Sequence, residues 1–119
     1  MKTRRSFPRL HVRISLGPGS AFGPGKAELL EKIAETGSIS AAARQMHMSY
    51  KRAWQLVEDM NRIFIHPVID KAAGGARGGG ANLTDCGKRV IRNYRTLQEK
   101  AQVSATRELA ALARYATGS

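Results

Sequence analysis

The sequence of 119 residues has little of what membrane and secreted proteins need. It contains one cysteine, Cys86, which excludes an internal disulfide and favours a reducing compartment. Its longest apolar runs cover only a few residues, too few to span a bilayer. The basic start, MKTRRSFPRLH, has no apolar segment behind it, so we expect no signal peptide. These absences favour a cytoplasmic protein without a membrane partner.

The sequence also lacks the residue clusters that catalysis and metal binding require. His11, His47 and His66 are far apart and have no cysteine partners at ligand spacing. No Ser-His-Asp set and no pair of carboxylates stands out. We therefore expect a protein that is not an enzyme and that has neither a metal site nor a cofactor.

Acidic residues are scarce, because nine Asp and Glu stand against 20 Lys and Arg. The formal net charge of +11 favours a polyanionic partner, since cations that contact phosphates release condensed counterions. A ribosomal protein or a protein at a membrane surface would be equally basic, so charge indicates the class of partner without choosing within it. The 42% of hydrophobic residues suffices for one domain with a modest core.

The first 24 residues are predicted to form a basic leader, a strand and a loop. Residues 1–9 form the leader, and the next eight alternate apolar with polar residues. This alternation is typical of a half-buried strand, whose apolar members are Leu10, Val12, Ile14 and Leu16. The segment Gly17–Gly25, GPGSAFGPG, is rich in glycine and proline, so we expect a loop with neither helix nor strand.

A helix is predicted over Lys26–Thr36, as the first element of a DNA-binding domain over residues 25–83. Its apolar residues fall on one face and are Leu29, Leu30, Ile33 and Ala34. Gly37 follows, and glycine readily takes the left-handed conformation of a helix cap. We expect this helix to pack across the back of the next two.

The stretch from Gly37 to Asn61 predicts two helices joined by a tight turn. Ser38 or Ser40 can cap the first helix and Ser49 the second, because a serine hydroxyl accepts a hydrogen bond from a free amide of the first turn. His47 falls at the turn, where one residue must be left-handed. Histidine is one of the few residues besides glycine that adopts this conformation at all often.

The second of these helices is predicted to run to about Arg62 with one buried face. Apolar residues recur on this face at three- and four-residue spacing and are Ala53, Leu56, Val57 and Met60. Lys51, Gln55 and Arg62 point the other way. Tyr50 and Trp54 border the apolar stripe. A short helix, a turn and a helix with a basic outer face is typical of a helix-turn-helix, which places its second helix in the major groove.

A hairpin is predicted to follow the second helix, because Pro67 blocks helix continuation. Its strands are Val68–Lys71 and Ala81–Leu83, and residues 72–80 form a glycine-rich tip. A hairpin in this place is a wing, and Arg77 at its tip can enter a narrow minor groove. A phosphate-binding loop is a poor alternative, because no Lys-Ser or Lys-Thr pair follows the last glycine. A hairpin tip without a ligand is the other alternative.

The last element, residues 84–119, is predicted to be a long helix for dimerisation. Thr84 is a suitable cap, and Asp85 suits the positive first turn. Apolar residues then recur at three or four residues, namely Val90, Ile91, Tyr94, Leu97, Ala101, Ala105, Leu109, Leu112 and Tyr115. A single helix over this range would be roughly 48 Å long, more than a domain of this size can cover. Its second half therefore either pairs with a second copy or folds back as a separate helix near Ser104.

Taken together, these segments resemble the DNA-binding part of the molybdate-responsive transcription regulators, the ModE family. The resemblance covers residues 10–98. The fold is also similar to that of LysR-type regulators, which have a different wing. The residues that carry the resemblance are GSIS (37–40), SYKRAW (49–54), EDMN (58–61), GGARGGGANLT (74–84), Gly87 and Tyr94.

The resemblance implies a mainly α fold with a small β component, a winged helix-turn-helix with an N-terminal strand and a long C-terminal dimerisation helix. It implies a homodimer that binds a palindromic operator in double-stranded DNA. ModE proteins continue into a molybdate-binding region, whereas this sequence ends at Ser119, so we expect a relative without that sensor. By position, the DNA contacts fall to Ser49, Tyr50, Lys51, Arg52, Gln55 and Arg77.

We expect a sequence-specific transcription regulator at the nucleoid, with Lys51 and Arg52 on phosphates or a guanine edge and Gln55 on an adenine edge. Two rival functions stay open. One is a non-specific or architectural nucleic-acid binder that uses charge alone. The other is a DNA-binding subunit that pairs with a separate sensor protein.

Overall fold

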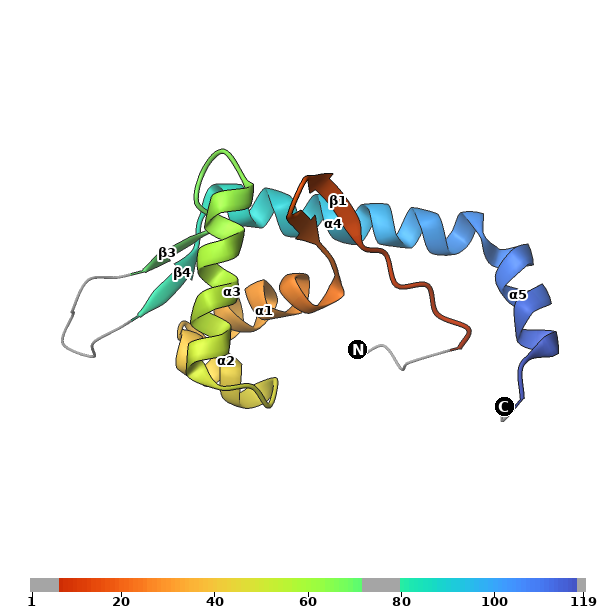
Figure 1. The fold of residues 1–119 in the computed structure, drawn as a ribbon, viewed down its shortest axis with the longest axis horizontal. Coiled ribbons are helices and arrows are strands. Elements are labelled where there is room, and N and C mark those ends of the chain that lie inside the picture. The colour runs from red at the N-terminus through yellow and green to blue at the C-terminus, as the bar shows by residue number, and fades with distance from the viewer. Residues whose placement is uncertain (1–6, 72–79, 118–119) are drawn as a thin grey trace.

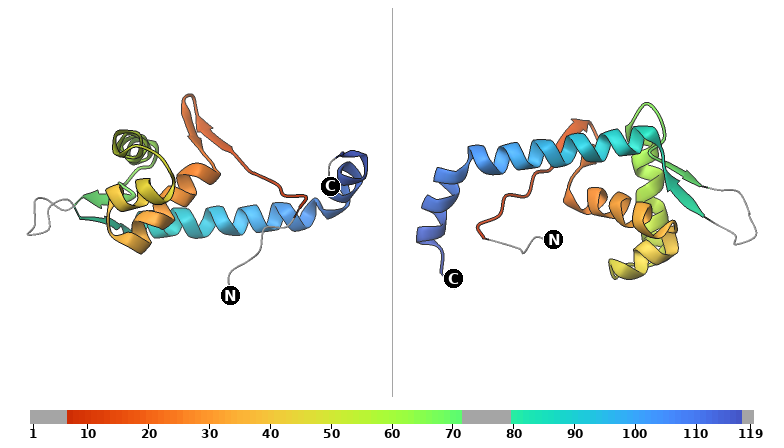
Figure 2. Two further views of the ribbon diagram at one scale, coloured as in Figure 1. Left: turned by 90° about the horizontal axis from the view of Figure 1, so that it is seen from below. Right: turned by 180° about the vertical axis from the view of Figure 1, so that it is seen from behind.

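The computed structural model describes residues 7–71 and 80–117, which form a mainly α fold with a small β component, as predicted (Figure 1). A helical head carries two short hairpins, and one long helix extends away from it (Figure 2). The elements in chain order are β1 (Ile14–Gly17), β2 (Ser20–Phe22), α1 (Pro24–Thr36), α2 (Ile39–Gln45), α3 (Tyr50–Ile63), β3 (Ile69–Lys71), β4 (Ala81–Leu83), α4 (Asp85–Ser104) and α5 (Thr106–Tyr115).

Helix α1 begins and ends at residues suited to those places. Pro24 occupies its first turn, where a missing amide hydrogen costs nothing. Gly37 ends the helix with φ 72°, and its amide donates a hydrogen bond to the Ile33 carbonyl at 2.7 Å. The predicted glycine cap is therefore confirmed. The predicted face is correct for its leucines and Ile33 but wrong for Ala34, which is exposed, while Ala27 takes the buried place.

The predicted loop over Gly17–Gly25 is wrong, because it contains the strand β2 and the start of α1. Strand β2 pairs antiparallel with β1, and Ile14 lies opposite Phe22. Phe22 is 2% exposed and packs edge-on against Phe64 and Tyr94, with ring centroids 5.7 and 5.2 Å away. This burial stabilises a strand that three residues between two Gly-Pro turns would not predict.

The predicted N-terminal strand is also shorter than expected, because β1 starts at Ile14. Residues 10–13 run alongside α4 and bond to it instead of pairing with a second strand. The Leu10 amide donates to the Gln102 side-chain oxygen at 2.9 Å, and the Tyr94 hydroxyl donates to the Val12 carbonyl at 2.6 Å. Burial raises the pKa of Tyr94, against a smaller opposite effect of the Arg95 charge, so the hydroxyl stays protonated as a donor.

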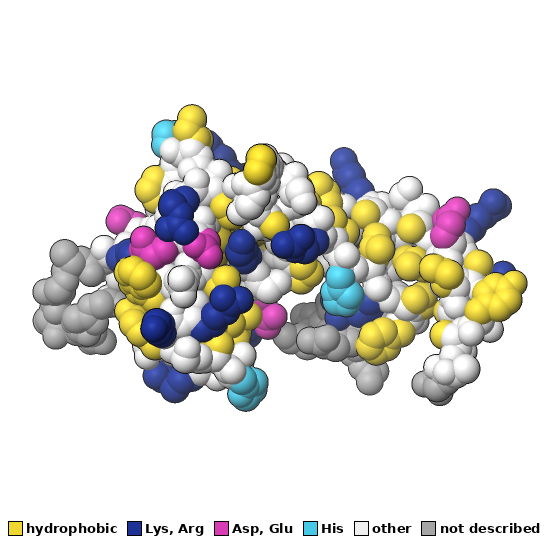
Figure 3. Space-filling view, viewed as in Figure 1, with side chains coloured by type: hydrophobic (Ala, Val, Ile, Leu, Met, Phe, Trp, Pro, Cys, Tyr) yellow, Lys and Arg dark blue, Asp and Glu magenta, His cyan; other side chains and the backbone are white. Residues whose placement is uncertain are grey.

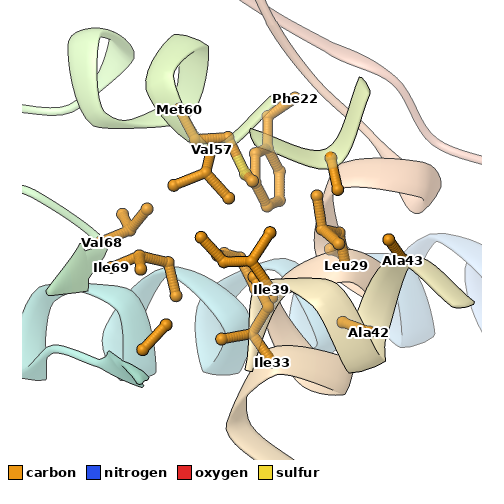
Figure 4. Close-up of a cluster of buried hydrophobic side chains, with 14 of the residues drawn as sticks. Phe22, Leu29, Ile33, Ile39, Ala42, Ala43, Val57, Met60, Val68 and Ile69 are labelled. Atoms are coloured by element: carbon orange, nitrogen blue, oxygen red, sulfur yellow. The ribbon is translucent and has the colours of Figure 1, made fainter. Parts of the chain in front are cut away.

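The core lies where α1, α2, α3 and the start of β3 meet (Figure 4). Among the described residues, every side chain classed as buried at this centre is apolar. The largest fully buried side chains are Leu29, Leu30, Ile33, Met60, Ile69, Val57 and Val68. Burial of these residues fixes α3 against α1 and α2 and leaves the opposite side of α3 outside.

Helix α4 is joined closely to the head at its first turn. Thr84 caps it, since its hydroxyl accepts from the Gly87 amide at 3.0 Å, as predicted. A Cβ on Gly87 would lie 2.3 Å from the Val68 carbonyl oxygen, so only glycine allows this approach. Farther along, the Arg95 guanidinium donates to both carboxylate oxygens of Glu31 on α1, at 2.9 and 2.6 Å.

The C-terminal segment forms two helices, as one of the two predicted alternatives has it, but α5 turns aside from the axis of α4 instead of folding back along it (Figure 1). Pairing with a second copy stays a prediction. Helix α4 ends at Ser104 and α5 begins at Thr106, so Ala105 alone connects them. The Thr106 hydroxyl donates to the Val103 carbonyl at 2.7 Å, a side-chain bond of the kind that bends helices. No residue of α5 is buried. None of the helices in residues 7–71 and 80–117 is both long and apolar enough to cross a membrane.

Candidate nucleic-acid interface

The α2–turn–α3 unit has the caps and the turn that its sequence predicts. The Ser38 hydroxyl accepts from the Ala41 amide at 3.0 Å and so caps α2, whereas the Ser40 hydroxyl accepts from the Arg44 guanidinium. His47 has φ 57°, the predicted left-handed residue. The Ser49 hydroxyl accepts from the Arg52 amide at 3.0 Å, which caps α3.

Helix α3 is divided between a buried side and an exposed side. Ala53, Val57 and Met60 are 0% exposed, and Leu56 is partly buried. Small residues on α2, Ala42 and Ala43, are buried where the two helices meet. The N-terminal half of α3 and its cap bring five of the six predicted site residues together on the exposed side, namely Ser49, Tyr50, Lys51, Arg52 and Gln55.

The charges on α3 are arranged unevenly along the helix. Glu58 and Asp59, in its second half, form ion pairs with Lys71 and Arg62. Within the described residues, Lys51 and Arg52 have no ion-pair partner. Lys and Arg side chains gather over α2 and the adjoining end of α3 (Figure 3). The N-terminal half of α3 therefore presents positive charge next to hydroxyl and amide groups, the composition that phosphates and base edges require.

Asn61 fixes the base of the wing to the end of α3. Its side-chain oxygen accepts from the Val68 and Ile69 amides at 2.8 and 3.2 Å, and its amide donates to the Ile69 carbonyl at 3.3 Å. Sequence reasoning did not assign Asn61 a role. The sequence signal for this role was an amide side chain shortly before Pro67, where the helix must end and the strand begin.

Lys71 is a second contact between wing and helix that sequence reasoning did not identify. Its ammonium group lies 4.8 Å from the centre of the Trp54 ring and pairs with Glu58, so it bridges β3 and α3. Trp54 is 41% exposed, which agrees with its predicted place at the border of the buried stripe. No pattern within α3 could have indicated Lys71, because 13 residues separate it from Glu58.

The wing is present as predicted, with β3 and β4 antiparallel and Asp70 opposite Asn82. It is also tied to the junction of α1 and α2, because the Ala81 amide donates to the Gly37 carbonyl at 3.0 Å. The wing thus has fixed contacts with α3 and with the residue that ends α1. Arg77, the predicted wing-tip contact, lies outside the described residues.

Solved structures share this arrangement of helices and wing. The crystal structure of the CbnR_DBD-DNA complex matches with a TM-score of 0.58 and 22% identity, over 74% of this chain and 95% of that chain. VV2_1132, a LysR family transcriptional regulator, matches with a TM-score of 0.52 and 20% identity, over 71% of this chain and 26% of its own. These likenesses confirm the winged helix-turn-helix fold.

Curated relatives have much higher sequence identity over part of their length. The molybdenum transport protein ModE of Azotobacter vinelandii is 39% identical over 101 residues, 83% of this chain and 37% of the relative. The molybdenum-pterin-binding protein MopB of Rhodobacter capsulatus is 45% identical over 80 residues, which cover 67% of this chain and 30% of the relative. The DNA-binding transcriptional dual regulator ModE of Escherichia coli (strain K12) is 42% identical over 76 residues, which cover 64% of this chain and 29% of the relative.

This chain therefore spans about a third of the length of the curated relatives that it matches. The predicted resemblance to the ModE family is confirmed by these relatives. Residues 25–88, more than half of the chain, match the family described as bacterial regulatory helix-turn-helix protein, lysR family. The chain belongs to this lysR family of bacterial regulatory helix-turn-helix proteins.

Proposed function

We propose that the chain is a sequence-specific, DNA-binding transcriptional regulator of the ModE type that binds a palindromic operator as a homodimer. The observation that carries the proposal is the exposed N-terminal half of α3. Its cations are free of carboxylate partners within the described residues, and its opposite side is locked in the core. The proposal concerns DNA recognition and assigns no molybdate-binding role to the chain.

Each residue of this surface has a chemical role in the proposal. Lys51 and Arg52 contact phosphates or a guanine edge, and Gln55 hydrogen-bonds an adenine edge in the major groove. Tyr50, 54% exposed, offers a hydroxyl group and an apolar ring to bases. The Ser49 hydroxyl, at the start of α3, donates a hydrogen bond to the DNA. Arg77 remains a proposed minor-groove contact of the wing tip.

Homodimerisation is proposed from the C-terminal helices. Leu97 on α4 and Leu112 on α5 are 42% and 66% exposed, so apolar surface is left uncovered in the single chain. Two-fold symmetry would place the two α3 helices about 34 Å apart, or a multiple of this distance, in major grooves on one side of the duplex.

The proposal is tested by selecting bound sites from a pool of random duplexes. A palindrome is expected, and Gln55→Ala and Tyr50→Ala are expected to relax preference at particular positions, by about 1–3 kcal/mol for a lost bidentate contact. Arg77→Ala is expected to weaken binding to all sequences alike. If no consensus emerges and these variants bind like the parent protein at moderate salt, the proposal is wrong.

The net charge of +11 favours one alternative, a non-specific nucleic-acid binder. Competition separates the two functions. Bulk genomic DNA would displace a selected duplex at equal nucleotide concentration if binding used charge alone, whereas a base-reading protein would retain the selected duplex.

A further inference from the structure

An apolar groove lies between the β1–β2 hairpin and α4, away from the exposed side of α3. Its volume is about 310 Å³, and it is lined by side chains of β1, β2, the residue that follows α3 and the first four turns of α4. The two leucines that line it, Leu16 and Leu97, are 52% and 42% exposed. Arg89 is its only cationic lining residue among those described. The groove is thus apolar with one positive charge.

Helix α5 carries a surface that suits this groove. Leu109 and Leu112 of α5, together with Ala105 and Ala116 at its two ends, recur at three- and four-residue spacing and form one apolar stripe. Glu108 lies three residues after Ala105 and four before Leu112, so a carboxylate borders the stripe. Arg107 and Arg114 fall on the opposite side of the helix. Hydrophobic side chains gather along the second half of α4 and over α5 (Figure 3).

The groove cannot be filled by α5 of the same chain. A single residue, Ala105, connects α4 to α5, and α5 turns aside from the axis of α4 instead of reversing along it (Figure 1). Val90, in the groove, is about 22 Å from Ala105 along the helix. The segment that leads into β1 runs between the β1–β2 hairpin and the junction of α4 and α5 (Figure 2). Any α5 in the groove therefore comes from another molecule.

We propose that α5 of a second copy of this chain occupies the groove, and that the contact is made twice in a two-fold dimer. The inference rests on the proposed homodimer and specifies where its subunits meet. In an isologous dimer each subunit presents the same patch, so groove and helix satisfy each other and the assembly closes at two copies.

The dimensions of α4 agree with this arrangement. If two α4 helices run antiparallel and cross beside the exposed Leu97 of each, Arg89 lies level with Ala105 of the partner subunit, where the partner's α4 ends and its α5 begins. The first turns of the partner's α5 then cover the Cys86–Val90 end of the groove. Arg89 lies within one helical turn of Glu108 of the partner subunit, so the groove's cation meets the carboxylate beside the stripe.

Cys86 provides a probe for this contact, because it lines the groove and is the single cysteine of the chain. Ala105→Cys, Leu109→Cys and Leu112→Cys each place a second thiol on the apolar stripe of α5. Because neither Ala105 nor any residue of α5 is buried, these changes leave the core intact. Ala110→Cys, one residue away on the opposite side of the same helix, is the matched control.

Each full-length variant is treated with diamide, a thiol oxidant, and run on a non-reducing gel. At least one stripe variant is expected to move to a band of twice the monomer mass, whereas Ala110→Cys stays at the monomer mass. Adding Cys86→Ser to the cross-linking variant is expected to abolish the band, which identifies the bond as Cys86 to α5. Disulfides require Cα atoms roughly 4.4–6.8 Å apart, so the bond reports direct contact.

Light scattering of the unmodified protein separates this inference from the proposed function. A dimer in which no stripe variant cross-links through Cys86, or in which Ala110→Cys cross-links equally, overturns the inference and leaves the dimer in place. A ladder of larger products overturns the closed two-fold contact. A monomer at the concentrations that bind DNA overturns both the inference and the proposed homodimer.

Discussion

Replacing Asn61 with alanine is expected to loosen the wing from the recognition helix. The substitution removes three hydrogen bonds to Val68 and Ile69, at 2.8, 3.2 and 3.3 Å. Each such bond contributes about 0.5–1.5 kcal/mol, and the two longer ones belong at the lower end of this range. Val68 and Ile69 are 0% and 2% exposed, so water cannot fully replace the lost partner. We therefore expect a loss of about 2–3 kcal/mol in the free energy of unfolding.

The assay is urea unfolding followed by circular dichroism, with all proteins at one concentration because dimerisation would add to stability. Asn93→Ala is the matched control, since within residues 7–71 and 80–117 the Asn93 side-chain amide donates only to the Arg89 carbonyl in the same helix. Both changes gain the same helix propensity, up to about 0.7 kcal/mol, which the comparison cancels. Asn61→Asp keeps the acceptor oxygen and is expected to lose less stability than Asn61→Ala. Equal midpoints for Asn61→Ala and Asn93→Ala would refute the role of Asn61.

Three further predictions concern other contacts. Gly87→Ala is expected to destabilise the fold by about 1–3 kcal/mol, because the added Cβ has no room beside Val68. The control Gly25→Ala, whose added Cβ meets nothing within 4 Å, should change stability by less than about 1 kcal/mol. Equal effects of the two substitutions in thermal melts would contradict the close approach at Gly87. Lys51→Gln is expected to lower the slope of log binding constant against log salt concentration by about one phosphate contact. Arg107→Gln also removes one positive charge but should leave this slope unchanged. Equal slopes for the two variants would show that Lys51 is not in the interface. Tyr94→Phe is expected to cost about 1 kcal/mol through the lost bond to the Val12 carbonyl, and a melt identical to that of the parent protein would show that this bond adds nothing to stability.

Local chemistry explains what the sequence predicts well. Hydroxyl caps at Ser38 and Ser49, the left-handed His47 and the glycine cap at Gly37 each depend on a few neighbouring residues. Such features need no knowledge of the rest of the fold. The helices and the wing follow from them together with apolar spacing.

Long-range contacts explain what the sequence does not predict. Strand β2 forms because Phe22 reaches Phe64 and Tyr94, which are distant in sequence. Gly87 looks like a weak point within a helix, yet it is where a strand touches that helix. The roles of Asn61 and Lys71 likewise depend on where β3 runs. The DNA contacts of the five exposed residues at the start of α3, and of Arg77, remain predictions.

The tight seating of Gly87 against the Val68 carbonyl has a consequence for operator geometry. In a two-fold dimer, α4 is a lever arm about 30 Å long with this contact near its pivot. A change of about 5° in the tilt of α4 would shift its far end by about 3 Å, close to the rise of one base pair. Substitutions at this pivot should therefore change the preferred number of base pairs between half-sites while leaving the half-site sequence unaltered.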